Sequence, residues 1–189
     1  MRRRWLSIVV AMFCALLAVA TSASAEEPVG FLEWAWGTSS EIMIKQFFVP
    51  SCRFSPRFSP KEGSKTGVCS EYRVGDVQTT LVLWFQPDDS LTGYFMKFKS
   101  ESYPKMRGAV VERFGPPTSE STKEYTTRGG LNSSGEALYW QWPSGTRAFL
   151  SQVCGKQLGE SCLNVTTKPL EEWRLKDEEA KREQRKKGF

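Results

Sequence analysis

The sequence predicts an α+β fold, in which an antiparallel sheet of about six to eight strands carries two helices packed on one face and is followed by a charged C-terminal helix. Three observations support this class. Segments rich in Val, Leu and aromatic residues recur between turns that contain Pro, Asp or Gly. Two other segments carry the cap residues and apolar spacing of helices. From residue 169 onward, charged side chains of both signs dominate.

The N-terminus has the organisation of a secretory signal peptide. Residues 2–4 are arginines, residues 6–20 are almost wholly apolar, and residues 23–25 are the small residues Ala-Ser-Ala that signal peptidase accepts. The apolar run is shorter than the roughly 20 residues of a membrane-spanning helix. We therefore expect cleavage after Ala25 and a periplasmic or secreted location, most simply the periplasm of a bacterium. The alternative is an uncleaved N-terminal anchor.

This interpretation divides the chain into a signal at 1–25, a single α+β binding domain at 26–168 and a charged helical tail at 169–189. The full chain has a net charge of +5, from 26 basic and 21 acidic residues. Because three of the basic residues lie in the signal, the rest of the chain is nearly balanced in charge. We therefore expect no nucleic acid as a partner, and no transmembrane segment after signal removal.

The domain is expected to open with a strand over residues 31–36 and a helix from Thr38 to about Phe48. Thr38 and Glu41 have the T-x-x-E spacing of a capping box, in which each side chain satisfies a free amide of the first turn. Pro50 would help to end this helix because proline has no amide hydrogen to donate.

Three strands are expected next, over residues 68–74, 79–86 and 91–99. A Pro-Asp-Asp-Ser turn at 87–90 separates the second from the third, since proline presets φ and aspartate hydrogen-bonds locally. The third strand alternates in side-chain type with a period of two, which is typical of a half-buried antiparallel strand.

The clearest helix is expected over residues 103–114. Ser102 is a suitable N-cap, Pro104 suits the first turn, and Gly115 followed by two prolines ends the helix. The apolar side chains of this segment recur at steps of three and four and would form one buried face: Tyr103, Met106, Val110 and Phe114.

Four more strands are expected over residues 121–128, 137–142, 147–153 and 163–167, and Pro143-Ser144-Gly145 would form a hairpin turn between the second and third. In the charged tail, Leu170 and Trp173 could dock the first helical turn on the domain. Beyond Leu175 almost no residue is apolar, so we expect the rest of this helix to project into solvent.

Four cysteines remain after the signal, and an even number in an exported chain indicates disulfides. Of the three possible pairings, proximity along the chain favours Cys52 with Cys69 and Cys154 with Cys162. Metal binding is the alternative, but there is no C-x-x-C motif and no histidine in the chain. We expect no metal site and no cofactor.

The absence of histidine also limits the possible enzymes. It excludes Ser-His-Asp and Cys-His nucleophile systems and zinc sites of the H-E-x-x-H type. Carboxylate pairs remain possible, and Asp88 and Asp89, with Asp76 or Glu71, are candidates for acid–base chemistry or calcium. Because aspartate is common in turns, a structural role for Asp88 and Asp89 is the simpler interpretation.

The loop between Cys52 and Cys69 contains the phrase Arg-Phe-Ser-Pro twice. Exposed arginine and phenylalanine on a disulfide-limited loop would suit a protein interface. Alternatively, the phenylalanines pack beneath the loop and the arginines are only solubilising. The candidate binding residues are Arg53, Phe54, Arg57 and Phe58.

Two tryptophans on one predicted strand, Trp140 and Trp142, should share a face, with Tyr139 and Gln141 on the other. They could form a platform for a sugar or a small ligand. Core packing is the alternative interpretation, since aromatic side chains dominate buried cores.

Three segments together resemble a diffuse group of exported bacterial domains: WGTSSEIMIKQF, YPKMRGAVVERFGPPT and ALYWQWPSGTRAFLSQ. In that group Trp-Gly-Thr opens a short helix, and a tyrosine-led helix ends in Phe/Tyr-Gly-x-Pro. The group is similar to the beta-lactamase-inhibitor-like modules and to small outer-membrane assembly lipoprotein modules. The resemblance covers most of residues 30–167 and implies binding to other proteins, with no catalytic residue. The loop at 51–68, the charged tail and the lack of a lipobox depart from the pattern.

We therefore expect an exported, non-enzymatic binding or adaptor module that contacts another exported protein or an envelope component. Two alternatives stay open: a small-ligand or glycan-binding protein that uses sheet aromatics, and a histidine-free hydrolase of envelope polymers.

Overall fold

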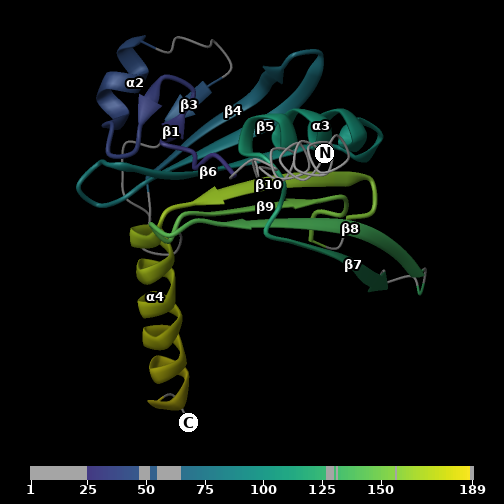
Figure 1. The fold of residues 1–189 in the computed structure, drawn as a ribbon. Coiled ribbons are helices and arrows are strands. Elements are labelled where there is room, and N and C mark those ends of the chain that lie inside the picture. The colour runs from purple at the N-terminus through teal and green to yellow at the C-terminus, as the bar shows by residue number, and fades with distance from the viewer. Residues whose placement is uncertain are drawn as a thin grey trace, which may run out of the picture.

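The protein is built around one large antiparallel sheet (Figure 1). The computed structural model describes residues 25–46, 52–54, 65–126, 130, 132–155 and 157–187. Within them, eight strands form the sheet in the order β3-β4-β5-β6-β10-β9-β8-β7. The strands are β3 (Cys52–Phe54), β4 (Lys65–Val74), β5 (Val77–Phe85), β6 (Leu91–Lys99), β7 (Ser119–Thr126), β8 (Asn132–Gln141), β9 (Arg147–Ser151) and β10 (Glu160–Thr166).

The sheet consists of two halves with the same order of elements. Helix α2 (Ser40–Gln46) precedes strands β3 to β6, and helix α3 (Tyr103–Phe114) precedes strands β7 to β10. Each half is therefore a helix followed by a four-stranded meander. The halves join through their last strands, β6 and β10, which pair antiparallel with Met96 opposite Leu163.

One face of the sheet is apolar and covered, and the other is open. Helices α2 and α3 lie on the covered face, together with a small hairpin of β1 (Gly30–Phe31) and β2 (Trp34–Ala35) (Figure 1). Side chains from both helices, the hairpin and the sheet form one buried core. Helix α4 (Lys168–Lys187) projects from the other side of the sheet (Figure 1). The predicted α+β class, with two helices on one face and a charged C-terminal helix, is confirmed.

Helix α3 has the buried face that the sequence predicts. Tyr103, Met106, Val110 and Phe114 are all buried. The helix ends at Gly115, whose φ of 74° is a left-handed conformation that glycine adopts without steric cost. Ser102 makes no side-chain cap, however, because a 3-10 turn over Ser100–Ser102 leads into the helix.

The first elements differ from the prediction. Instead of one strand over 31–36, the chain turns back at Leu32, with φ of 55°, and forms the β1–β2 hairpin. Helix α2 begins at Ser40, and the hydroxyl of Ser39, not of Thr38, accepts a hydrogen bond from the amide of Ile42. The predicted capping box is therefore wrong, because the amide and carbonyl of Thr38 bond to Ala35 and Leu91.

Strand β8 extends beyond the prediction, and strand β3 lies where a loop was expected. The polar segment before Ala137, expected to be a loop, belongs to β8 from Asn132 onward. It is extended because it pairs residue by residue with β7, with Ser133 opposite Tyr125. Backbone pairing with a neighbouring strand here outweighs the low strand preference of Asn, Ser and Gly.

Two cysteine pairs lie at disulfide distance, as proximity along the chain predicts. Cys52 and Cys69 are directly opposite on β3 and β4, with Cα atoms 3.9 Å apart. Cys154 and Cys162 close the turn before β10, with Cα atoms 5.3 Å apart. The first bond ties the edge strand to the sheet.

The C-terminal helix is attached through its first turns. Leu170 is buried, and its side chain lies so close to Gly93 that a Cβ there would come within 2.9 Å of it. The guanidinium of Arg174 lies 4.5 Å from the ring of Trp84. Leu175 is exposed, as are the described side chains beyond it, so the predicted projection is confirmed. No helix among the described residues has both the length and the apolar character required to cross a membrane.

Candidate ligand cavity beneath helix α3

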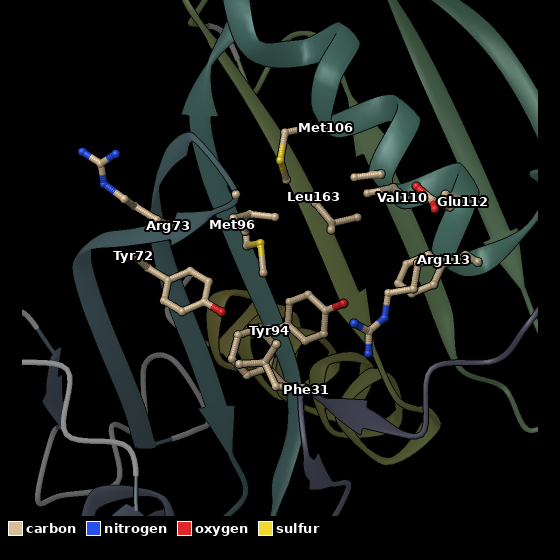
Figure 2. Close-up of a pocket in the computed structure, with 15 residues that line it drawn as sticks. Phe31, Tyr72, Arg73, Tyr94, Met96, Met106, Val110, Glu112, Arg113 and Leu163 are labelled. Atoms are coloured by element: carbon tan, nitrogen blue, oxygen red, sulfur yellow. The ribbon is translucent and has the colours of Figure 1, made fainter.

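A cavity of about 550 Å³ lies on the covered face of the sheet, between α3, the tip of the β4–β5 hairpin and β1. Figure 2 shows the side chains that line it. Most of its wall is apolar and is formed by Phe31, Met96, Met106, Val110, Phe114 and Leu163. Its polar side chains are Tyr72, Arg73, Tyr94, Glu112 and Arg113.

Regular side-chain periodicity places these residues together. Tyr94 and Met96 are alternate residues of β6, so both point to the covered face. Leu163 of β10 lies opposite Met96 and points the same way. Met106 and Val110 are four residues apart and share the buried face of α3. The cavity thus lies where the helix and the two central strands face one another.

Aromatic rings hold Tyr94 in position. The ring centroid of Phe31 is 4.9 Å from that of Tyr94, and Trp36 stacks on Tyr94 at 6.2 Å. Phe31 also lies 5.8 Å from Tyr72. These contacts fix the direction of the Tyr94 hydroxyl, which points into the cavity toward Arg113 (Figure 2).

The ring of Tyr94 is buried, and its hydroxyl opens into the cavity. The side chain is only 5% exposed, and no described residue forms a hydrogen bond with its oxygen. Burial raises the pKa of this phenol well above its usual value, and the nearby charge of Arg113 only partly opposes that shift. Tyr94 therefore stays neutral and keeps a proton to donate.

The charged side chains around the cavity differ in direction. Arg113 turns its guanidinium toward Tyr94, whereas Arg73 points away from the other labelled side chains and Glu112 lies beside Val110 (Figure 2). Arg113 has no hydrogen bond or ion pair with any described residue.

Burial also raises the pKa of Tyr72, and the charge of Glu33 adds to the shift. At this end of the cavity the exposed Arg113 is a cationic donor, and Tyr94 is a neutral one.

A polar cluster fixes α3 above the sheet beside this cavity. Glu136 accepts a hydrogen bond from the hydroxyl of Tyr103 at 2.8 Å and another from Nε of Arg107 at 3.0 Å. Burial works to raise the pKa of Glu136, but the hydrogen bonds from Arg107 and Tyr103 outweigh it and hold the pKa below the usual value. The cluster keeps the helix at a fixed height over the cavity.

The predicted loop site is only partly within the described residues. Arg53 is exposed on the edge strand β3. Phe54 is half-buried, with its ring 6.1 Å from that of Phe85, and a Cβ on Gly67 would come within 2.6 Å of it. Arg57 and Phe58 lie outside the described residues. Phe54 therefore packs toward the core, while Arg53 is available to a partner.

The alternative ligand platform is corrected by the structure. Trp140 and Trp142 share a face as predicted, but they are 1% and 5% exposed. Both pack edge-on against Phe114, with centroids 6.0 and 5.6 Å away. Their indole nitrogens donate to the carbonyls of Gly115 and Ala25. They form part of the core, because their face of the sheet is the one that the helices cover.

The opposite, open face carries the aromatic pair that sequence reasoning passed over. The rings of Tyr139 and Phe149 lie 4.7 Å apart. They line a hollow of about 600 Å³ together with Asn164, whose Oδ1 is buried without a described partner. The ammonium of Lys123 already lies 5.1 and 4.8 Å from the two ring centroids.

Three of the four predicted carboxylate candidates pair with neighbouring side chains, and the fourth, Glu71, is exposed. Asp88 accepts hydrogen bonds from the amide and hydroxyl of Ser90, and Asp89 accepts them from Ser40. Asp76 pairs with Lys105 of α3. No group of three or more cysteine or carboxylate side chains within the described residues could hold a metal ion.

Comparison with known proteins gives no relative: no family model matches the chain, and neither a curated protein nor a solved structure matches it. The resemblance to inhibitor-like and lipoprotein modules therefore stays a prediction.

Proposed function

We propose that the protein is an exported, non-enzymatic binding module that takes a small ligand with an apolar body into the cavity beneath α3. Export to a bacterial periplasm, or beyond it, is supported by the signal-like N-terminus and by the two cysteine pairs at disulfide distance.

The cavity is the observation that carries this proposal. Its volume of about 550 Å³ is within the range of small-molecule sites, which are concave, mostly apolar and provided with a few polar groups. A ligand that filled it would remove the apolar side chains of Met96, Met106 and Leu163 from water.

The backbone of Leu32 supports the same site. This residue lines the cavity and is 42% exposed, with φ of 55°. A left-handed φ is unfavourable for leucine, and such strain is concentrated at functional sites. Despite this backbone cost, Leu32 holds a large apolar side chain at the rim of the cavity, where it could contact an apolar ligand.

A tryptophan added at the cavity wall tests the proposal. Ala109 is an exposed residue of α3 that lines the cavity, so Ala109→Trp should fill the cavity without disturbing the core. Gly108→Trp is the matched control, because Gly108 is an exposed neighbour on α3 that does not line the cavity, and a Cβ there would meet no atom within 4 Å. Fluorescence titration with N-phenyl-1-naphthylamine, an uncharged apolar probe, should show binding by the wild type and Gly108→Trp and loss of binding in Ala109→Trp. Equal binding by all three proteins would contradict the proposal.

Contact with another exported protein or an envelope component is the second candidate function. The exposure of Arg53 on an edge strand favours it, because arginine is enriched at interfaces. Crosslinking in the native envelope followed by mass spectrometry should identify a partner joined near Arg53. Loss of that crosslink in Arg53→Ala, with unchanged folding, would support this role, and an unchanged crosslink would contradict it.

A further inference from the structure

We infer that the ligand of the cavity is a monocarboxylate with an apolar tail, of the medium-chain fatty acid type, whose carboxylate is held by Arg113 and Tyr94. This inference rests on the proposed function and adds the chemistry of the ligand's polar end.

The first argument is the unused hydrogen-bonding capacity at one end of the cavity. The hydroxyl of Tyr94 points into the cavity, where no described residue forms a hydrogen bond with it (Figure 2). Since the phenol stays neutral, it can donate its proton to a ligand oxygen. A ligand oxygen at this end of the cavity would accept that hydrogen bond.

The second argument is the charge beside that hydroxyl. The guanidinium of Arg113 points toward the same space and has no ion pair with a described residue (Figure 2). Guanidinium and carboxylate groups match in geometry and form charge-assisted hydrogen bonds about twice as strong as neutral ones. Together, Arg113 and Tyr94 offer donors to both oxygens of one carboxylate.

The third argument concerns the size of the charge and the rest of the ligand. Arg73 points away from the other labelled side chains, so Arg113 is the cationic group turned toward Tyr94 (Figure 2). Arg113 and Glu112 are both exposed residues of α3 that line the cavity. One guanidinium balances a single negative charge, which favours a monoanion over a phosphate or a dicarboxylate. The remaining wall is apolar and offers an alkyl chain contact with Met96, Met106 and Leu163.

Calorimetric titration of the disulfide-intact protein with sodium decanoate and with decan-1-ol tests this inference. The wild type should bind decanoate more tightly than the alcohol. Arg113→Met should weaken decanoate binding about tenfold to a hundredfold, because a hydrogen bond to a charged group is lost, and leave decan-1-ol unchanged. Tyr94→Phe should weaken decanoate about threefold to tenfold, since it removes one neutral hydrogen bond.

Arg73→Met is the matched control, because it removes an arginine of the same cavity that points away from it. It should bind decanoate like the wild type. The inference is overturned if decan-1-ol binds the wild type as tightly as decanoate, if Arg113→Met binds like Arg73→Met, or if sodium sulfate competes as strongly as decanoate. In those cases a neutral apolar ligand still satisfies the proposed function. If neither decanoate nor decan-1-ol binds, the proposed function fails with the inference.

Discussion

The carboxylate of Asp89 accepts two hydrogen bonds from Ser40, one from the backbone amide at 3.1 Å and one from the hydroxyl at 2.6 Å. Ser40 is the first residue of helix α2, and Asp89 lies in the turn between β5 and β6. A turn 49 residues later in the chain therefore caps the N-terminus of the helix. This contact fixes α2 over its end of the sheet.

Substitutions at Asp89 should distinguish two contributions to stability: the cap that its carboxylate provides to α2 and the cost of its left-handed backbone conformation. Asp89 has a φ of 70°, which asparagine and glycine tolerate better than alanine does. We expect Asp89→Ala to lower the free energy of unfolding by about 1–2 kcal/mol, because it loses the cap and keeps the strain. Asp89→Gly and Asp89→Asn should lower the free energy of unfolding by less than Asp89→Ala does. Urea unfolding of the three variants gives this order.

Amide hydrogen exchange provides the control for that series. Asp88→Ala removes a cap within the same turn, where the carboxylate of Asp88 accepts hydrogen bonds from the amide and hydroxyl of Ser90. Exchange of the α2 amides should accelerate in Asp89→Ala and stay unchanged in Asp88→Ala. Equal protection of α2 in both variants would show that Asp89 does not hold the helix.

The cap also shows what the sequence could and could not predict. The buried face of α3 follows from local spacing, because Tyr103, Met106, Val110 and Phe114 repeat at helical intervals. The cap of α2 does not, since Thr38 and Glu41 form a plausible local box while the carboxylate that bonds Ser40 comes from a distant turn. Local rules predict elements well, but they predict contacts between elements only where the residues lie close in the chain, as for Cys52 and Cys69.

The cavity was missed for the same physical reason. Tyr94 has the sequence pattern of an ordinary inward strand residue, and Arg113 that of a basic residue in the last turn of a helix, where it suits the helix dipole. Neither position has a local signature of a binding site. Only the packing of α3 across β6 and β10 brings the two side chains to one space (Figure 2).

The stability of the protein should depend on pH through Glu136. Its pKa is lowered on folding, so its hydrogen bonds contribute stability above the ordinary glutamate pKa of 4.5 and lose it as the pH falls through the lower pKa of the folded state. Glu136→Gln should therefore cost about 1 kcal/mol at neutral pH, a value reduced for partial exposure, and progressively less in acid. Urea unfolding across this pH range measures the difference.

Glu112→Gln is the comparison for this pH effect. Glu112 is an exposed carboxylate of α3 with no hydrogen bond to a described residue. We expect its substitution to change the free energy of unfolding by less than about 0.5 kcal/mol at any of these pH values. If Glu136→Gln shows the same flat profile, the cluster with Tyr103 and Arg107 does not stabilise the fold.

Alanine substitutions on β3 should separate a packing residue from an interface residue. Phe54→Ala removes a half-buried ring from Phe85 and should lower the free energy of unfolding by about 2 kcal/mol, less than for a fully buried phenylalanine. Arg53→Ala changes an exposed side chain and should stay within about 0.5 kcal/mol of the wild type. Thermal and urea unfolding provide both values. Equal stability of the two variants would mean that the Phe54 ring does not stabilise the sheet edge.

Leu32 offers a test in which stability and binding should change in opposite directions. Glycine reaches the φ of 55° without steric cost, so Leu32→Gly should relieve about 1 kcal/mol of backbone strain. Glycine also gives the unfolded chain more conformational entropy, which offsets part of this gain. The free energy of unfolding should therefore rise by about 0.5 kcal/mol. The same substitution removes an apolar side chain from the cavity rim and should weaken decan-1-ol binding several-fold.

Leu32→Asn separates the two effects further. Asparagine tolerates the left-handed conformation but presents a polar amide to the cavity, so this variant should match the wild type in stability and bind the alcohol as weakly as Leu32→Gly. Urea unfolding and calorimetry on the same samples give both quantities. A loss of stability in Leu32→Gly would mean that leucine stabilises the hairpin by packing. The strained turn would then need no ligand to explain it, because the side chain would offset its own backbone cost within the fold.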